Sequence, residues 1–149
     1  MTINQTTFLS DTVKFIRDNL SSNITDPISS SRVGRERFVM TSYPQRPVKY
    51  PIITIIGTMQ DATSLGMGSE SMKVVLRLEV RIWARNVKEK DELTEQVFNQ
   101  LRTNQIGTGS TTEATLYGFE QVGVVDVDEP GEDNPKSKIM TIKYFYILN

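Results

Sequence analysis

The stretch "DVDEPGEDN" concentrates acidic side chains that could bind a cation, namely Asp126, Asp128, Glu129, Glu132 and Asp133. Carboxylate oxygens around a glycine turn are the ligands that Ca²⁺ takes from a protein loop. Gly131 stands where such a loop turns sharply, but Pro130 occupies a ligand position and Ser137 replaces the bidentate glutamate. We therefore expect no metal site and interpret this acidic connection, residues 126–133, as a solvated or electrostatic contact surface. A calcium or magnesium site is the alternative.

A second charged stretch, "DPISSSRVGRER", carries Arg32, Arg35 and Arg37, and we call residues 32–37 the arginine loop. Arginine guanidinium groups bind phosphates and carboxylates through paired hydrogen bonds. One interpretation is therefore a contact with another subunit or with DNA, although the loop lacks the interleaved aromatic residues of many nucleic-acid surfaces. The other is a solvated loop, whose charge Asp26 and Glu36 offset in part.

Trp83 stands on the outward side of an expected strand, between Arg81 and Arg85. A tryptophan exposed to water on all sides is unfavourable because its ring is large and mainly apolar. The residue is expected either beneath a helix or at an interface, where Trp and Arg are enriched.

The chain has no histidine and no cysteine, which removes most nucleophilic catalysis and most zinc sites. Carboxylate, lysine and tyrosine chemistry is still possible. The stretches "GMGSES" and "GTGST" match neither a phosphate-binding loop nor a dinucleotide fingerprint, and no lysine follows a carboxylate by two positions as in many small nucleases. We expect no enzyme and no cofactor.

Length and composition predict one domain covering residues 1–149. A net charge of −1 argues against a dedicated nucleic-acid binder, which usually has a basic excess. No apolar run approaches the roughly 20 residues of a membrane-spanning helix. The first residues lack the basic start and apolar stretch of a signal peptide, so we expect neither export nor a membrane.

Periodicity predicts two helices. Residues 8–23 place Leu9, Val13, Ile16 and Leu20 on one face, which is the pattern of an amphipathic helix. A second helix is expected from Asn86, whose side chain can cap it with Glu89 as the capping-box partner. Its apolar stripe consists of Leu93, Val97 and Leu101.

The remaining signals are those of strands. The strongest is "MKVVLRLEVRIWA", residues 72–84, in which alternate residues are apolar. Shorter strands are expected at 37–43 and 50–58, a mobile loop at 59–72, and two closing strands at 116–127 and 137–148. Neighbouring strands joined by short turns should be antiparallel. The order predicts an α+β domain with a single, mostly antiparallel sheet flanked by two helices.

At "YPIITII", "LEVRIWARNVKEKDELTEQVFNQLR" and "KIMTIKYFYIL" the sequence resembles the tail terminator, or tail completion, proteins of long-tailed phages and related archaeal viruses. The resemblance covers nearly the whole chain in the order of its elements. It implies a homo-oligomeric ring, commonly of six subunits, at the head-proximal end of the tail tube. Such a ring stops tube growth and joins the tail to the head connector.

The resemblance further implies a structural protein of the virion tail or neck that is assembled in the host cytoplasm. Its partners are the tail tube protein and a head connector or stopper protein, while DNA passes through the ring without sequence-specific binding. The family has no catalytic residues to carry over. Another neck component, such as a head-side stopper or connector adaptor, is one alternative. An unrelated binding module or a carboxylate-dependent enzyme is the other.

Packing around a ring joins two different patches of each subunit, so opposite charges on those patches favour closure. We hypothesise that the arginine loop of one subunit meets the acidic connection of its neighbour.

Overall fold

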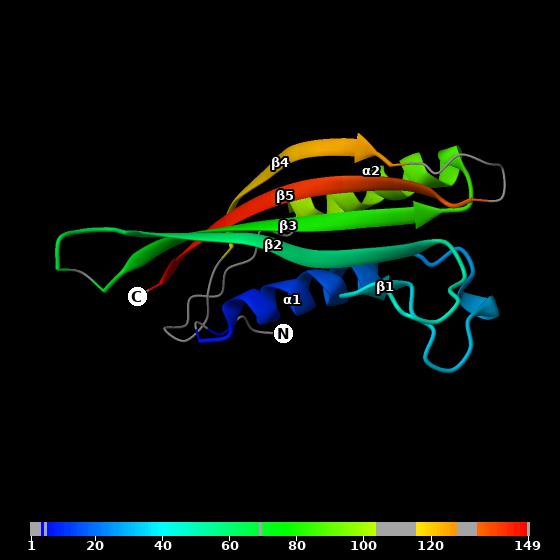
Figure 1. Cartoon of the computed structure of the whole chain (residues 1–149), viewed down its shortest axis with the longest axis horizontal. Coiled ribbons are helices and arrows are strands. Elements are labelled where there is room, and N and C mark those ends of the chain that lie inside the picture. The colour runs from blue at the N-terminus through cyan, green and yellow to red at the C-terminus, as the bar shows by residue number, and fades with distance from the viewer. Residues whose placement is uncertain (1–3, 5, 69, 104–115, 128–133, 149) are drawn as a thin grey trace.

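The computed structural model describes residues 4, 6–68, 70–103, 116–127 and 134–148. Its α+β fold has one five-stranded sheet in the order β1-β2-β3-β5-β4 (Figure 1). This confirms the fold class expected from the sequence. The elements in chain order are α1 Phe8–Asn23, a short 3-10 turn Ser29–Ser31, β1 Val39–Met40, β2 Ile52–Ser64, β3 Met72–Ala84, α2 Val87–Thr103, β4 Tyr117–Asp126 and β5 Lys136–Leu148.

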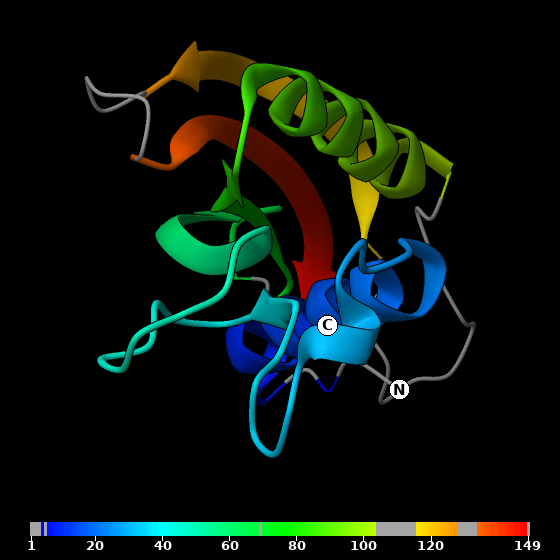
Figure 2. The same cartoon turned by 90° about the vertical axis from the view of Figure 1, so that its right-hand side faces the viewer.

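Four of the five strands form an antiparallel sheet, in which β2 pairs with β3, β3 with β5 and β5 with β4. The edge strand β1 pairs with β2 in parallel, with Val39 opposite Ile53. Both helices pack on the same side of the curved sheet (Figure 2). We call that side the helix face and the other side the open face.

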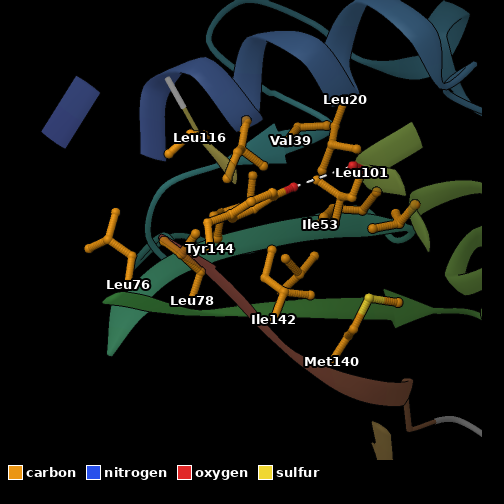
Figure 3. Close-up of a cluster of buried hydrophobic side chains, with 14 of the residues drawn as sticks. Leu20, Val39, Ile53, Leu76, Leu78, Leu101, Leu116, Met140, Ile142 and Tyr144 are labelled. Carbon is orange, nitrogen blue, oxygen red and sulfur yellow. Dashed lines mark hydrogen bonds between the residues drawn. The ribbon is translucent and has the colours of Figure 1, made fainter. Parts of the chain in front are cut away.

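The core lies between the helix face and the two helices. Alternate residues of β3 are fully buried there, including Leu76, Leu78, Val80 and Ile82, as their alternation with polar residues predicts. From β5, Tyr144 joins them, and its hydroxyl donates a hydrogen bond to the Leu101 carbonyl at the end of α2 (3.4 Å; Figure 3). Burial raises the pKa of that hydroxyl, so it stays a neutral donor.

The two helices follow the sequence prediction with small corrections. Helix α1 buries Phe8, Thr12, Ile16 and Leu20. Leu9, which was expected on the buried face, is 37% exposed. The buried face of α1 therefore includes Phe8 in its place.

At α2 the amide of Glu89 donates to Asn86 Oδ1 (2.9 Å), as a helix cap should. The Glu89 carboxylate accepts a hydrogen bond from the amide of Arg85 (3.1 Å) rather than from that of Asn86. It also forms an ion pair with the Arg85 guanidinium.

Strand β2 is longer than its sequence indicates. It continues to Ser64, through residues expected to be a mobile loop, and pairs with β3 up to Ser64 opposite Met72. The resulting hairpin extends beyond the helices (Figure 1). Residues 60–64 have no apolar alternation because no helix covers them, so periodicity could not reveal the strand.

The expectation that the first two strands are antiparallel is wrong, and the strand expected at 37–43 is only Val39–Met40. The connection from β1 to β2 spans residues 41–51 and contains Pro44, Pro47 and Pro51. It is therefore long enough to bring the chain back to the same end of the sheet, which a tight turn would not allow.

Because β3 is the central strand, truncating a buried side chain there should lower stability most. We expect Leu78→Ala to reduce the free energy of unfolding by roughly 2–5 kcal/mol, since it removes buried methyl groups and leaves a cavity. Chemical denaturation measures the loss. The control Leu65→Ala, at a side chain that is 51% exposed, should change stability by less than about 0.5 kcal/mol. Equal losses for the two variants would contradict this account of the core.

Candidate functional site

Arg32 is engaged within its own chain. Its side chain is 7% exposed, and its Nε lies 2.5 Å from Asp26 Oδ2. Its Nη1 donates to the Lys49 carbonyl (2.9 Å) and its Nη2 to the carbonyl of Pro51. These bonds tie the segment after α1 to the residues just before β2. Arg32 thus holds the fold here, and its guanidinium is not exposed for a neighbouring subunit.

Arg35 and Arg37, in contrast, are exposed. Arg37 Nη1 donates to the carbonyls of Gly34 (3.2 Å) and Glu36 (3.1 Å), while Arg46 donates to the carbonyl of Arg35 (2.7 Å). The loop is therefore held mainly through its own backbone. It presents two arginines at the surface beside β1, and their contact with another subunit stays a prediction.

Asp126 is the last residue of β4 and forms an ion pair with a buried lysine. Its Oδ1 lies 3.0 Å from Lys90 Nζ and 3.6 Å from Lys138 Nζ. The hydrogen bond from Lys90 and the charge of Lys138 hold the pKa of the Asp126 carboxyl below its usual value. Lys138 also binds Asp91 of α2 (2.9 Å). This network fixes β4 and β5 to the start of α2. The other residues predicted for the acidic connection, Asp128, Glu129 and Glu132, lie outside the described residues.

Lys90 was missed at the sequence level. Its side chain is 3% exposed because it occupies the buried stripe of α2 together with Leu93 and Val97. Lys90 precedes Leu93 by three residues, and this spacing places it on the apolar face of the helix. A lysine there requires a carboxylate partner, so the sequence did contain a signal for the ion pair.

Trp83 is covered by the β1–β2 connection and not by a helix, so that part of the expectation is wrong. Its ring centre lies 5.1 Å from that of Tyr43 and 6.4 Å from that of Tyr50. The Arg81 guanidinium lies 3.8 Å from the centre of the ring. The hydroxyls of Tyr43 and Tyr50 are 2.7 Å apart. Together these contacts shield much of the tryptophan ring, and an interface role for it stays a prediction.

The two long edges of the sheet expose apolar side chains. On β4 these are Tyr117, Val122, Val124 and Val125, of which Val125 is 61% exposed. On β2, Ile56 is 44% exposed. Exposed apolar residues on an edge strand are typical of a surface that binds another strand. The run "VGVVDV" was a sequence signal for this surface, but it was interpreted only as a strand.

Several carboxylates of the described chain have a pKa below the usual range. Bonds from Thr7 and from the backbone amide of Asn4 lower that of Asp11, and the amide of Val33 lowers that of Glu36. A general acid or base at neutral pH needs a carboxyl pKa raised toward 7. These groups therefore suit structural hydrogen bonds and ion pairs. In the described ranges, no three acidic side chains are grouped as a metal site would require.

No known family model matches the chain, and no curated protein matches its sequence. Within the residues that the structure describes, no helix has the length and apolar character needed to cross a membrane.

We expect Arg32→Ala to lower the free energy of unfolding by roughly 3 kcal/mol, because it leaves the mostly buried Asp26 carboxylate without its partner. Arg35→Ala is the matched control, an exposed arginine of the same loop, and should cost less than about 0.5 kcal/mol. Urea denaturation measures both. A small loss for Arg32→Ala would show that its bonds do not stabilise the fold.

Asp126→Asn should lower the free energy of unfolding by about 1 kcal/mol at neutral pH, because the buried Lys90 loses an ion pair that solvent partly screens, the Asp126 side chain being 59% exposed. The folded-state pKa of Asp126 is below the value of 3.8 expected for a free side chain. The stabilisation is therefore complete above that value and is lost as the pH falls through the lower, folded-state pKa.

Stability measured against pH should show the difference between Asp126→Asn and the original chain disappearing only in acid. Glu92→Gln is the control, because its partner Lys88 is exposed and 3.8 Å away, and it should change stability by less than about 0.5 kcal/mol. A difference between Asp126→Asn and the original chain that stays constant below pH 3 would contradict the ion pair.

Proposed function

We propose that this chain is a structural protein of a virus particle, which forms a ring at the head-proximal end of the tail tube. The ring ends polymerisation of the tube and joins the tail to the head connector. The observation that carries this proposal is the order and arrangement of the elements. They agree with the design that the resemblance to tail terminator proteins implies.

Three details of the fold support the proposal. An N-terminal helix precedes the sheet, and Pro51 stands immediately before β2. Strand β3 then runs into α2 with only Arg85 and Asn86 between them. Finally, β4 and β5 close the sheet beside β3. The resemblance implies the same features for the family, namely an N-terminal helix, a proline before the first core strand, a long strand that runs into a helix, and two closing strands.

The surface chemistry also favours a protein that acts by binding other proteins. The ion pairs around Asp126 and Arg32 stabilise the fold, whereas both edge strands expose apolar side chains, among them Ile56 on β2 and Val125 on β4. In this proposal the partners are further copies of the chain, the tail tube protein and a head connector or stopper protein. DNA passes through the ring without sequence-specific contacts. The protein belongs to the tail or neck of the virion and is assembled in the host cytoplasm.

Deleting the gene from its virus tests the proposal. Filled heads beside unattached, abnormally long tails are the expected result, because nothing would then stop tube growth. Restoring the gene on a plasmid should return normal tails and is the control. Electron microscopy of the lysate gives tail length and attachment directly.

Tails of normal length beside heads that have lost DNA would instead assign the protein to the head side of the neck, as a stopper or connector adaptor. Intact, infectious particles from the deletion would overturn a neck role altogether.

A further inference from the structure

The sheet ends in two long free edges. Strand β1 pairs with β2 only at Ile53 and Thr54, so Ile55–Ser64 has no neighbour on its outer side among the described residues. The outer side of β4, Tyr117–Asp126, is free in the same sense. Unpaired backbone groups along an edge are a template for another strand, and proteins usually protect them with charged residues, lysine above all, with proline or with β-bulges. Neither β2 nor β4 contains a lysine, an arginine or a proline.

The directions of the two edge strands suit pairing between copies of the chain. Three successive antiparallel pairings separate β2 from β4, so the two strands run in opposite directions. When a second copy is placed beside the first by rotation about an axis along the strands, its β2 lies antiparallel to β4 of the first copy. Each copy then contacts one neighbour through β2 and the other neighbour through β4. A closed ring requires this kind of head-to-tail contact.

The bulges indicate where the contact is regular. They interrupt β2 between Gly57 and Met59, and β4 at Tyr117–Glu120 and Gln121–Gly123. On the near side of its bulge, the regular part of β2 that β1 leaves uncovered is Ile55–Gly57, and the regular part of β4 is its end. Both lie at the same end of the sheet, since Ile53 pairs with Ile82, Ile82 with Lys138, and Lys138 with Asp126.

Side chains at that end match in polarity and face. Val125 is directly opposite Ile139, which is opposite Arg81 on the open face. Ile56 is opposite Glu79 of β3, which lies two residues from Arg81 and so on the same face. Placing Val125 of one copy against Ile56 of the next would therefore cover two apolar side chains that are 61% and 44% exposed in the single chain.

Charge adds little to this contact. The exposed arginines Arg35 and Arg37 precede β1, which lies beside the first residues of β2. The two acidic residues of β4 are already paired within the chain, Glu120 with Lys143 (3.2 Å) and Asp126 with Lys90 and Lys138. The contact between the edges therefore rests on strand pairing and on apolar side chains.

We propose that β4 of one copy pairs antiparallel with β2 of the next copy, with Val125 opposite Ile56, and that this contact closes the ring. The inference rests on the ring-forming function proposed above and assigns its subunit interface.

Cysteine cross-linking tests the register directly, because the chain has no cysteine of its own. Virus that lacks the gene is supplied with the double variant Ile56→Cys and Val125→Cys, and its purified particles are mildly oxidised. Directly opposite residues on paired strands have Cβ atoms about 4.5–5.5 Å apart, which is close enough for a disulfide after a small adjustment. We expect a ladder of covalent multimers on a non-reducing gel that collapses to monomer on reduction.

The double variant Ile56→Cys and Val87→Cys is the matched control. Val87 is 51% exposed but lies at the start of α2, on the helix face, whereas Val125 lies on the open face, so no ladder should form. Dimers from Val125→Cys alone would mean that β4 pairs with β4, which overturns the head-to-tail pairing. Normal particles without a ladder from the Ile56 and Val125 pair would also overturn it, while leaving the terminator role intact. A deletion without a tail phenotype would instead remove the function itself.

A second pair of variants keeps the test independent of cysteine chemistry. Val125→Lys places a charge on the edge and should reduce the yield of infectious particles about tenfold or more, equivalent to about 1.4 kcal/mol of lost association. Val87→Lys, at a similarly exposed valine, should leave the yield near that of the original chain. Similar yields from the two variants would contradict the edge contact, provided that thermal unfolding shows both to be folded.

Discussion

The burial of one face of β3 is the interaction on which the rest of the structure depends. Its alternate side chains from Val74 to Ile82 are completely excluded from water. Helix α2 packs against β3 and β5, and α1 packs against β1, β2 and α2, so that all join one core. Burying such side chains contributes about 1.5–3 kcal/mol each and is the main favourable term in folding. Because β3 is central, its register with β2 and β5 places every other strand. The exposed edges are therefore a consequence of how the core is built.

The polar contacts refine this arrangement at one end of the sheet. The Lys90–Asp126 ion pair holds the end of β4 against α2, and Arg32 holds the arginine loop against the beginning of β2. From the sequence, Asp126 and Arg32 were interpreted as contacts with a partner. In the structure, their bonds within the chain fix the positions of the two edges. In our proposal the surfaces left for a neighbouring copy are the apolar residues Val125 and Ile56, with Arg35 and Arg37 nearby.

Sequence patterns predicted the elements with strong local signals. The alternation in β3, the cap at Asn86 and the spacing of Leu93, Val97 and Leu101 each reflect interactions within a single element. The patterns failed where a distant contact decides the structure. The far part of β2 is a strand because β3 pairs with it, although residues 60–64 carry no apolar alternation.

The same limit applies to the site. Arg32 is largely buried because backbone carbonyls of Lys49 and Pro51 converge on it, and no local signal reveals that. Lys90 is different, since its place on an apolar stripe could have been recognised.

A reconstruction of the virion neck by cryo-electron microscopy tests the central claim most directly. The account predicts a ring of this α+β fold between the last layer of tube subunits and the head-side components, with neighbouring sheets joined edge to edge. A neck in which every component is assigned and this fold is missing would contradict it.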